Sequence, residues 1–402
     1  MAKIRSRRRL RPRLAPRRLP RRRSLRLRTC LRSLALTSDA HPEWDGRESF
    51  SRINPKLQIG WDSTSLGALK KCPRLYQLSI VEGWRRTPRP GTPGNIHFRY
   101  GILYHRALEV YDHKRSEGLD HEAAVLESII DLVHGCADWE DLADKEAAER
   151  ATGDGHHVRK VTDGPSPGWQ RYVGPWDPNK ELDEDKAAKN AKTLPNLFRS
   201  VVWYLDRFGE NDPIDTIQLE NGKPAVELSF RFNAGFGTQS TGEPIMLSGH
   251  LDRAGNFAGM AHVVDRKTSS TTLGQYYFDQ FNPNNQMSLY SIAGRVVTGT
   301  PIKGVIIDAA QIAKGFTAFQ RGITTRTEGQ LEEWLNDFQF YVALAERFAS
   351  SGYWPMNDTA CNDFGGCTFR GICSKDPKVR DTYLKASFHV EKWDPLKVRG
   401  EI

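Results

Sequence analysis

The sequence predicts an α/β fold in which a β-sheet core is flanked by helices. Near the middle, GHLDRAGNFAGMAHVVDRKTSS holds two short runs around a glycine-rich bend, which is typical of a β-hairpin folding about residues 258 and 259. The alternating run KPAVELSFRF and the β-branched run KGVIIDAAQIAK predict further strands. Two amphipathic stretches, TLPNLFRSVVWYLDRFGE and EGQLEEWLNDFQFYVALAERFAS, predict helices.

The N-terminal segment carries the basic charge of the chain. Residues 1–38 contain Lys3 and fourteen arginines and no acid, so removing their fifteen charges from the formal net charge of +9 leaves −6 for the remainder. We expect residues 1–40 to be a disordered, proline-broken tail. It is interpreted as a nonspecific phosphate-binding arm, an organelle transit segment or an over-extended start, and we favour the first and third equally.

The first elements after the tail are a loop over residues 40–60 and a short amphipathic helix. That helix starts near Ser65, with Thr64 or Ser63 as its N-cap. VEGWRRTPRPGTPG then reads as a basic loop. Residues 96–115 form a helix that carries His105.

Residues 135–192 are predicted to be a helical insertion. The stretch is polar and rich in glycine, with Trp139, Trp169 and Trp176 interspersed. Such aromatic residues stack nucleic-acid bases in single-strand channels. We prefer the alternative that they pack the insertion against the main domain.

The predicted hairpin brings two acids and a lysine to one small volume. If the strands fold about residues 258 and 259, Asp252 lies directly opposite Asp265, and Lys267 points to the same face as Asp265. Two carboxylates at that distance repel unless a cation lies between them, and Mg²⁺ or Mn²⁺ suits oxygen ligands. The alternative is an exposed hairpin with a solvated Asp/Lys pair.

Four short motifs follow one another along the chain: Gly101–His105, Gly249–Asp252, Asp265–Lys267 and Gln286–Tyr290. They read G-x-x-x-H, G-x-x-D, D-x-K and Q-x-x-x-Y. In this order they resemble the pattern of the RecB-like branch of the PD-(D/E)xK nuclease superfamily. The resemblance covers residues 60–375, apart from the insertion. It implies a restriction-endonuclease-like mixed sheet flanked by helices, in a nuclease domain over residues 41–375.

The resemblance also implies roles for individual residues. His105, Asp252, Asp265 and the backbone carbonyl of Arg266 would bind Mg²⁺ or Mn²⁺, and Lys267 would activate or position water. Gln286 and Tyr290, on a helix starting near Asn282 or Pro283, would orient Lys267 or contact a phosphate. A buried Gln–Tyr contact without a substrate role is the alternative. Glu227 is a second-rank active-site candidate, with a charged residue at a strand edge as the alternative.

The cysteines resemble those of the iron–sulfur subfamily of these nucleases, which includes AddB-type and CRISPR-associated exonucleases. Cys72 precedes a proline, and three more cysteines lie in a segment at 355–375 expected to close on Cys72. The resemblance implies a 4Fe–4S cluster on Cys72, Cys361, Cys367 and Cys373. The spacing C-x5-C-x5-C departs from the family's C-x2-C-x5-C, which weakens the case for Cys361. Zinc or free thiols are the alternatives, and Cys30 and Cys136 are expected to be ordinary thiols.

The resulting hypothesis is a metal-dependent DNA nuclease, most plainly an exonuclease acting on single strands or DNA ends in recombination, repair or viral DNA metabolism. Arg85, Arg86 and Arg89 are candidate contacts to the DNA backbone, or parts of a solvated loop. The chain has no Walker P-loop, which leaves room for a helicase or recombination protein as a partner. The sequence contains no run of 18 apolar residues, so no membrane span is predicted. We expect a cytoplasmic protein of a bacterial or virus-infected cell. A noncatalytic DNA-binding or assembly factor and an RNA nuclease are the competing hypotheses, and residues 376–402 are expected to be a tail.

Overall fold

The computed structural model describes residues 48–87, 95–162, 168–180, 182–363 and 366–395. The chain divides into two compact units, Met1–Ser38 and Asp39–Ile402, and all described residues belong to the second. The expected arginine-rich tail therefore lies outside the described residues.

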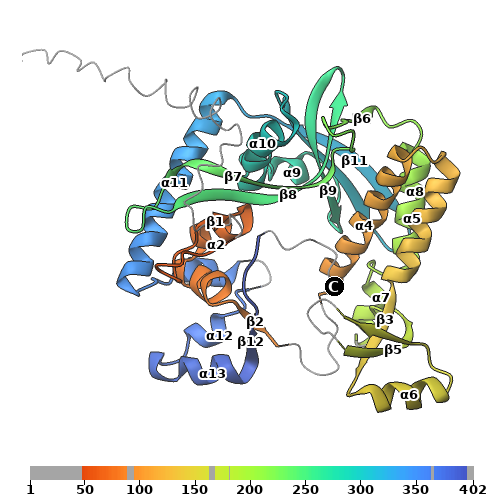
Figure 1. Cartoon of the computed structure of the whole chain (residues 1–402), viewed down its shortest axis with the longest axis horizontal. Helices are drawn as coiled ribbons and strands as arrows, with labels where there is room; N and C mark the ends of the chain where they lie inside the picture. Colours follow the sequence, from red (N-terminus) through yellow and green to blue (C-terminus); the bar gives the residue numbers. More distant parts are fainter. Residues whose placement is uncertain (1–47, 88–94, 163–167, 181, 364–365, 396–402) are drawn as a thin grey trace, which may run out of the picture. The chain divides into compact units, whose positions relative to one another are not determined.

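A seven-stranded sheet forms the centre of the second unit (Figure 1). Its strands run in the order β1-β8-β9-β10-β11, and β6 and β7 also pair with β8. The β1–β8 and β9–β10 pairs are parallel and the others antiparallel, which confirms the predicted mixed sheet. The strands are β1 (Gly60–Trp61), β6 (Ile214–Thr216), β7 (Val226–Gly237), β8 (Pro244–Phe257), β9 (Met260–Ser269), β10 (Gly304–Ile312) and β11 (Thr317–Thr324).

The predicted hairpin is formed by β8 and β9. Its two-residue turn consists of Ala258 and Gly259, which both have positive φ, at 50° and 76°. Positive φ at both central residues is typical of the hairpin turn whose twist matches the strands. The paired ladder runs from Phe257–Met260 to Arg253–Val264 and ends there.

Three helices cover one side of the sheet and lie beside one another in Figure 1. They are α4 (Ile96–Ser116), α5 (His121–Gly135) and α8 (Leu194–Phe208). Their apolar residues form one core with Ala310 and Ile312 of β10. The Asn95 side chain accepts a hydrogen bond from the Phe98 N–H and so caps the start of α4. The expected helix 96–115 is confirmed almost to the residue.

Four further helices complete the main body: α2 (Ser63–Lys71), α9 (Gln275–Asp279), α10 (Asn285–Thr298) and α11 (Glu328–Ser351). Two boundaries differ from the sequence analysis. Asp62, rather than Thr64 or Ser63, caps α2, because its carboxylate accepts from the Ser65 N–H while Ser65 accepts from the Asp62 N–H. Helix α10 begins after the Asn284 cap, beyond Asn282 and Pro283.

The insertion is less helical than expected. It holds α6 (Lys145–Gly153) and α7 (Glu184–Lys189), but also a three-stranded antiparallel sheet of β3 (Ala137–Leu142), β4 (Val158–Val161) and β5 (Gly168–Pro175). Trp176 is buried in the core with α4 and α8, as preferred above. Trp139 instead stacks under Arg159, with the guanidinium carbon 3.9 Å from its ring centroid. Cross-strand aromatic and cationic pairs thus stabilise this sheet from within.

The C-terminal part is also more ordered than expected, because residues up to Val390 form regular elements. β12 (Phe388–Val390) pairs with β2 (Trp84–Arg86), so 84–86 is a strand within the stretch expected to be a basic loop. The remaining elements are α3 (Pro73–Tyr76), the π-helix Gln77–Val81, the 3-10 helices Asp358–Asn362 and Pro377–Val379, α12 (Arg370–Cys373) and α13 (Arg380–Ser387). Among the described residues, no helix is both long and apolar enough to cross a membrane.

Candidate active site

Asp265 and Lys267 lie on the same face of β9, as predicted. Lys267 Nζ lies 2.8 Å from each carboxylate oxygen of Asp265. The Asp265 side chain is 2% exposed, whereas the Lys267 side chain is 29% exposed. Burial raises the pKa of the Asp265 carboxyl, Lys267 lowers it, and neighbouring Asp252 raises it further. Lys267 therefore pairs with a buried carboxylate while part of its own side chain remains exposed to solvent.

Asp252 lies where β8 separates from β9. The two strands stop pairing at Arg253–Val264, one step before the expected Asp252–Asp265 pair. Instead, Asp252 Oδ2 accepts a hydrogen bond of 2.8 Å from the backbone N–H of Arg266. The Asp252 carboxylate thus binds the β9 backbone where the β8–β9 ladder has ended, and it lies near enough to Asp265 to raise the pKa of that acid. The side chain is 2% exposed.

His105 approaches the same carboxylate from α4. Its Nδ1 lies 3.5 Å from Asp252 Oδ2, which is an ion-pair distance if the ring is protonated. This nitrogen is buried and makes no hydrogen bond in the described part of the chain. A buried ring nitrogen without a hydrogen bond is costly unless another partner, such as a cation, approaches it.

Glu227 completes a group of potential metal ligands. Its carboxylate, an Asp252 oxygen and a His105 nitrogen all lie within 4.8 Å of one another. Glu227 also has a φ of +45°, which is uncommon for a residue with a side chain. Such strain clusters at functional sites, where the surrounding structure maintains it. From the sequence, Glu227 is expected only as a second-rank candidate and Asp265 as a ligand, whereas this compact group contains Glu227 and does not include Asp265.

From α10, Gln286 contacts the lysine and Tyr290 contacts Gln286. Lys267 Nζ donates to Gln286 Oε1 at 3.2 Å, and Gln286 Nε2 donates to Tyr290 Oη at 3.0 Å. The i, i+4 spacing on one helix makes the second contact possible. Tyr290 is buried. A chain of hydrogen bonds therefore runs from Lys267 through Gln286 to Tyr290, and only Gln286 touches the lysine.

The donor set fits a hard divalent cation. One imidazole nitrogen and carboxylate oxygens are ligands that Mg²⁺ and Mn²⁺ accept. The buried His105 Nδ1 makes no hydrogen bond within the described residues, although it lies 3.5 Å from Asp252 Oδ2. A metal ion bound between these two atoms would satisfy both. Without a cation, the Asp252 and Asp265 charges would raise the free energy of the folded state.

The arginines that follow the two acids were missed by the sequence analysis. Because side chains alternate along a strand, Arg253 and Arg266 point away from the acids they follow. Arg266 Nη2 lies 2.6 Å from Asp112 Oδ2 on α4, and Arg253 Nη1 lies 2.7 Å from an oxygen of Asp212. The repeated Asp-Arg dipeptide was the available signal.

The Asp212 carboxylate anchors a second arginine in the same network. Arg321 of β11 pairs with Asp212 and lies 3.1 Å from Asp308 Oδ2, which also accepts a hydrogen bond from Tyr204 at 2.5 Å. Burial alone would raise the pKa of Asp212, but Arg321 and Arg253 together lower it below its ordinary value.

Asn357 bridges two of the four cysteines expected to bind a cluster. Its N–H donates to Cys72 Sγ at 3.3 Å, and its carbonyl accepts from Cys361 Sγ at 4.0 Å. Cys367 and Cys373 pack against a separate small core around Phe369. Burial raises the pKa of Cys373, and neighbouring Cys367 and Cys361 add to the rise. Among the described residues, no three of these sulfurs lie within 4.8 Å of one another.

The candidate DNA-binding arginines differ in their surroundings. Arg85 Nη1 donates to the Ser79 carbonyl at 2.5 Å, and burial lowers the pKa of its guanidinium. Arg85 therefore serves the packing of this segment. Arg86 is exposed, and Arg89 lies outside the described residues.

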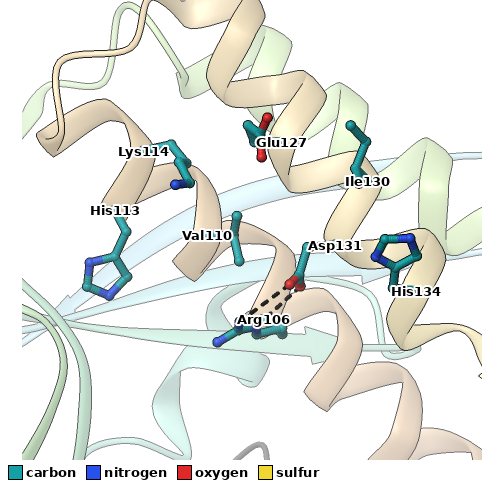
Figure 2. A pocket seen from close by; sticks show the side chains of 8 residues that line it. All are labelled: Arg106, Val110, His113, Lys114, Glu127, Ile130, Asp131 and His134. Atoms are coloured by element: carbon teal, nitrogen blue, oxygen red, sulfur yellow. Dashed lines mark hydrogen bonds and ion pairs between the residues drawn. The ribbon is translucent and has the colours of Figure 1, made fainter. Parts of the chain in front are cut away.

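A separate surface groove lies between α4 and α5 (Figure 2). Its volume is about 340 Å³, and an ion pair between Arg106 and Asp131 crosses it. Arg106 follows His105 but points to another side of α4, since successive helical residues are rotated by about 100°. None of the predicted site residues lines this groove; its lining consists of Arg106, Val110, His113, Lys114, Glu127, Ile130, Asp131 and His134.

Among comparisons with known proteins, one family model matches most of the chain. The family model described as "PD-(D/E)XK nuclease superfamily" matches residues 63–374. No curated protein matches the chain. A solved structure titled "Crystal structure of SSO0001" is 14% identical, with a TM-score of 0.21. That match covers 39% of this chain and 63% of the other, so this chain spans less than two thirds of that protein.

Proposed function

The chain belongs to the PD-(D/E)XK nuclease superfamily, and we propose that it is a Mg²⁺- or Mn²⁺-dependent deoxyribonuclease that hydrolyses phosphodiester bonds. The observation that supports this most strongly is the meeting of His105, Glu227 and Asp252 beside the Asp265–Lys267 pair. Three potential ligands from three different elements gather next to a lysine. An exposed hairpin with a solvated Asp/Lys pair does not explain why both acids are buried.

We propose His105, Glu227, Asp252 and Asp265 as the residues that hold the ion. A divalent ion bound by them supplies Lewis acidity toward a phosphodiester and acidifies water. The protein's own contribution is to hold the carboxylates in place: the Arg266 N–H binds Asp252, and Lys267 binds Asp265. These contacts fix the ligands before the substrate arrives.

Lys267 is proposed to position the attacking water and to stabilise charge on the phosphate. An ammonium has three donors. Hydrogen bonds to Asp265 and Gln286 use two of them, so the third is available for a water or a phosphate oxygen. The side chain is 29% exposed, which leaves its head group accessible. Gln286, itself bound to Tyr290, sets the direction of the ammonium.

For the substrate, we propose single-stranded DNA or DNA ends, cleaved by exonuclease action in recombination, repair or viral DNA metabolism. Without a P-loop in the sequence, duplex opening would come from a helicase partner. Exposed Arg86, on strand β2 where it pairs with Phe388 of β12, is a proposed contact to the DNA backbone.

The test is digestion of end-labelled DNA with Mg²⁺ or Mn²⁺, with and without chelator, on single-stranded, duplex, linear and circular substrates. We expect release of labelled nucleotides from linear single strands only when metal is present. Cleavage of circular DNA would exclude strict exonuclease action, and preference for RNA would change the substrate class. DNA binding without any metal-dependent cleavage would favour the noncatalytic factor instead.

We also propose a 4Fe–4S cluster held by Cys72, Cys361, Cys367 and Cys373. Support comes from Asn357, which contacts the sulfurs of both Cys72 and Cys361. Cys367 and Cys361 also lie near enough to Cys373 to raise the pKa of its thiol. A cluster there would join the first helices of the nuclease domain to its C-terminal segment. Anaerobically purified protein should then contain iron and inorganic sulfide. Stoichiometric zinc without iron would replace the cluster by a zinc site.

A further inference from the structure

The three-stranded sheet of the insertion carries two adjacent rows of side chains on one face. The first row consists of Arg159 on β4, Gln170 on β5 and Asp141 on β3, which are directly opposed. In the second row, Tyr172 on β5 opposes Trp139 on β3. Opposed residues share a face of the sheet, and so do residues two apart on one strand, such as Gln170 and Tyr172. Because Tyr172 is 38% exposed and Arg159 is also exposed, this face is open to solvent.

The second row is aromatic and extends over all three strands. The ring centroids of Trp139 and Tyr172 lie 5.7 Å apart, and the His157 ring lies 5.7 Å from that of Trp139. His157 directly precedes β4, and its carbonyl accepts a hydrogen bond of 2.8 Å from the Tyr172 N–H. The His157 side chain is exposed. Three rings from three segments therefore meet on the open face.

Arg159 is held in one orientation across this face. Its guanidinium carbon lies 3.9 Å from the centroid of the Trp139 ring. Its Nε and Nη2 both donate to Gln170 Oε1, at 3.0 and 2.8 Å. Gln170 is fixed in turn by Asp141, whose Oδ1 accepts from Gln170 Nε2 at 2.7 Å. A planar cation that is already stacked and hydrogen-bonded loses little conformational freedom when it binds a ligand.

Arg159 also lacks an acidic partner, unlike Arg171 of the same sheet. Arg171 Nη2 lies 2.7 Å from Glu140 Oε2. Within the described residues, by contrast, Gln170 is the one hydrogen-bond partner of the Arg159 side chain, and no carboxylate forms an ion pair with it. Two of the five N–H donors of the guanidinium bind Gln170, so the donors on Nη1 remain available for an oxyanion.

We propose that this face binds single-stranded nucleic acid, with a backbone phosphate on Arg159 and unpaired bases stacked on the rings of Tyr172 and His157. A nucleotide strand offers an anion and a planar base in every unit, whereas an acidic peptide would satisfy the arginine but not the rings. The bases must be unpaired, because paired bases are stacked on their own neighbours. The inference rests on the proposed nuclease function and adds a preference for unpaired strands.

The face is attached to the helix that carries His105. Asp138, the residue before Trp139, has its Oδ1 2.7 Å from Arg99 Nη1 on α4. Trp176, the residue after β5, is buried in the core shared by α4 and α8. Arg99 and His105 are six residues apart on α4, about 9 Å along its axis. A strand bound on the face is therefore held by a segment anchored to the helix of the proposed metal-binding group.

The experiment is fluorescence anisotropy of a labelled oligothymidylate and of a duplex of equal length, in chelator so that nothing is cleaved. The basic residues 1–38 contribute to binding of both, so each variant of the full chain is compared with the parent at matched salt concentrations. Tyr172→Ala should weaken single-strand binding about tenfold and change duplex binding little. Tyr172→Phe, which keeps the ring, should retain the parental affinity.

Arg159 is tested through the dependence of binding on salt. Arg159→Gln should weaken single-strand binding and reduce the salt dependence of log Kd by about 0.7, the loss of one phosphate contact. Arg159→Lys keeps the charge but not the planar fork, so it should retain the salt dependence and bind more weakly than the parent.

Matched controls come from the other face of the sheet and from a remote helix. Lys160, the next residue on β4, points to the opposite face, where its Nζ lies 5.6 Å from the centroid of the Trp169 ring. Phe340 on α11 is 65% exposed. Lys160→Gln and Phe340→Ala should both bind as the parent does. All of these variants change exposed side chains, so they are expected to fold, and their melting temperatures check this.

Three outcomes would overturn the proposed face. The first is parental affinity and salt dependence in both Tyr172→Ala and Arg159→Gln. The second is an equal loss on single strands and duplex in Tyr172→Ala, which would exclude stacking on unpaired bases. The third is binding of polyglutamate, but not of the oligothymidylate, that depends on Tyr172 and Arg159, which would assign the face to an acidic protein.

These measurements need no metal, so their failure is distinguishable from failure of the nuclease proposal. Single-strand binding that depends on Tyr172 and Arg159, without cleavage in any metal, would support the face and contradict the nuclease function. Metal-dependent cleavage by the parent, together with parental binding by both variants, would support the nuclease function and contradict the face.

Discussion

The two acids of the β8–β9 hairpin and the two arginines that follow them are adjacent in sequence, yet their charges are handled in opposite ways. Arg253 pairs with Asp212, and Arg266 pairs with Asp112, all of them largely buried. Asp252 and Asp265, by contrast, lie together beside His105, whose buried Nδ1 makes no hydrogen bond among the described residues. One set of charges is matched by protein groups, and the other favours a cation.

The difference shows how one hairpin can serve stability and chemistry at once. Burial alone would lower the pKa of Arg266, but Asp112 raises it above its ordinary value. The pKa of Asp265 is instead raised, with burial as the main cause. A buried pair of opposite charges is strongly destabilised by losing one partner, whereas a cluster of acids gains by losing a charge or binding a metal. The same type of substitution should therefore act differently on the two sets.

The largest effect is expected on catalysis from Lys267→Ala. Loss of a group that positions water and stabilises charge should lower the cleavage rate by about a thousandfold. The protein should remain folded, because the pKa of buried Asp265 is already raised and this acid can take up a proton once the lysine is gone. Metal-dependent cleavage and thermal unfolding measured on the same preparation check both parts, with Lys145→Ala as a control. A fully active variant would remove lysine from the mechanism.

The next largest effect is expected on stability from Asp112→Asn, which leaves the Arg266 guanidinium buried without its carboxylate. Breaking such a pair should lower the free energy of unfolding by about 3–5 kcal/mol, measured by urea denaturation. Replacing both partners, in Asp112→Leu with Arg266→Met, should recover most of the loss because no lone charge remains buried. If the single and double variants were equally unstable, packing rather than charge would explain the pair.

A smaller effect is expected on the stabilisation of the fold by metal, which should depend on the acids Asp252 and Asp265 but not on the arginine pairs. At a Mn²⁺ concentration 100 times Kd, binding should stabilise the parent by about 2.7 kcal/mol. Asp252→Asn should lose this response without lowering stability in chelator, since it removes one of two neighbouring acids. Asp212→Asn should keep the response but be less stable, because it leaves Arg253 and Arg321 without their shared carboxylate. Thermal shifts of both variants with Mn²⁺ and with chelator decide the comparison, and identical behaviour would contradict it.

Sequence patterns were sufficient for features that depend on local chemistry. The glycine-containing turn, the two-residue spacing of Asp265 and Lys267 and the helical spacing of Gln286 and Tyr290 each constrain geometry on their own. The separation of β8 from β9 at Asp252 was not predictable, because there a side chain binds the neighbouring backbone. The place of Glu227 in the ligand group was under-ranked for a related reason: a strand residue with positive φ has no sequence signature.

The partners of Arg253 and Arg266 show the same limit at longer range. Asp112 lies 154 positions from Arg266 and Asp212 lies 41 positions from Arg253, so only the packing of α4 and the sheet brings them together. Likewise, the three-stranded sheet of the insertion and the β2–β12 pair depend on contacts between separate segments. Pattern-based reasoning detects periodicity within a segment, but it does not reveal which segments meet.

The smallest effect is expected on stability, from a substitution in the turn that connects β8 to β9. Ala258 has a φ of +50°, a conformation that is strained for a residue with a β-carbon, whereas asparagine tolerates it through local hydrogen bonding. Ala258→Asn should therefore raise the free energy of unfolding by about 0.5–1 kcal/mol. Because the turn is remote from both Asp252 and Lys267, the cleavage rate should not change. Urea denaturation and cleavage assays on this variant check both parts of the prediction. A higher cleavage rate would contradict it, because it would mean that motion of the turn, rather than the arginine pairs, limits how firmly Asp252 and Asp265 are positioned.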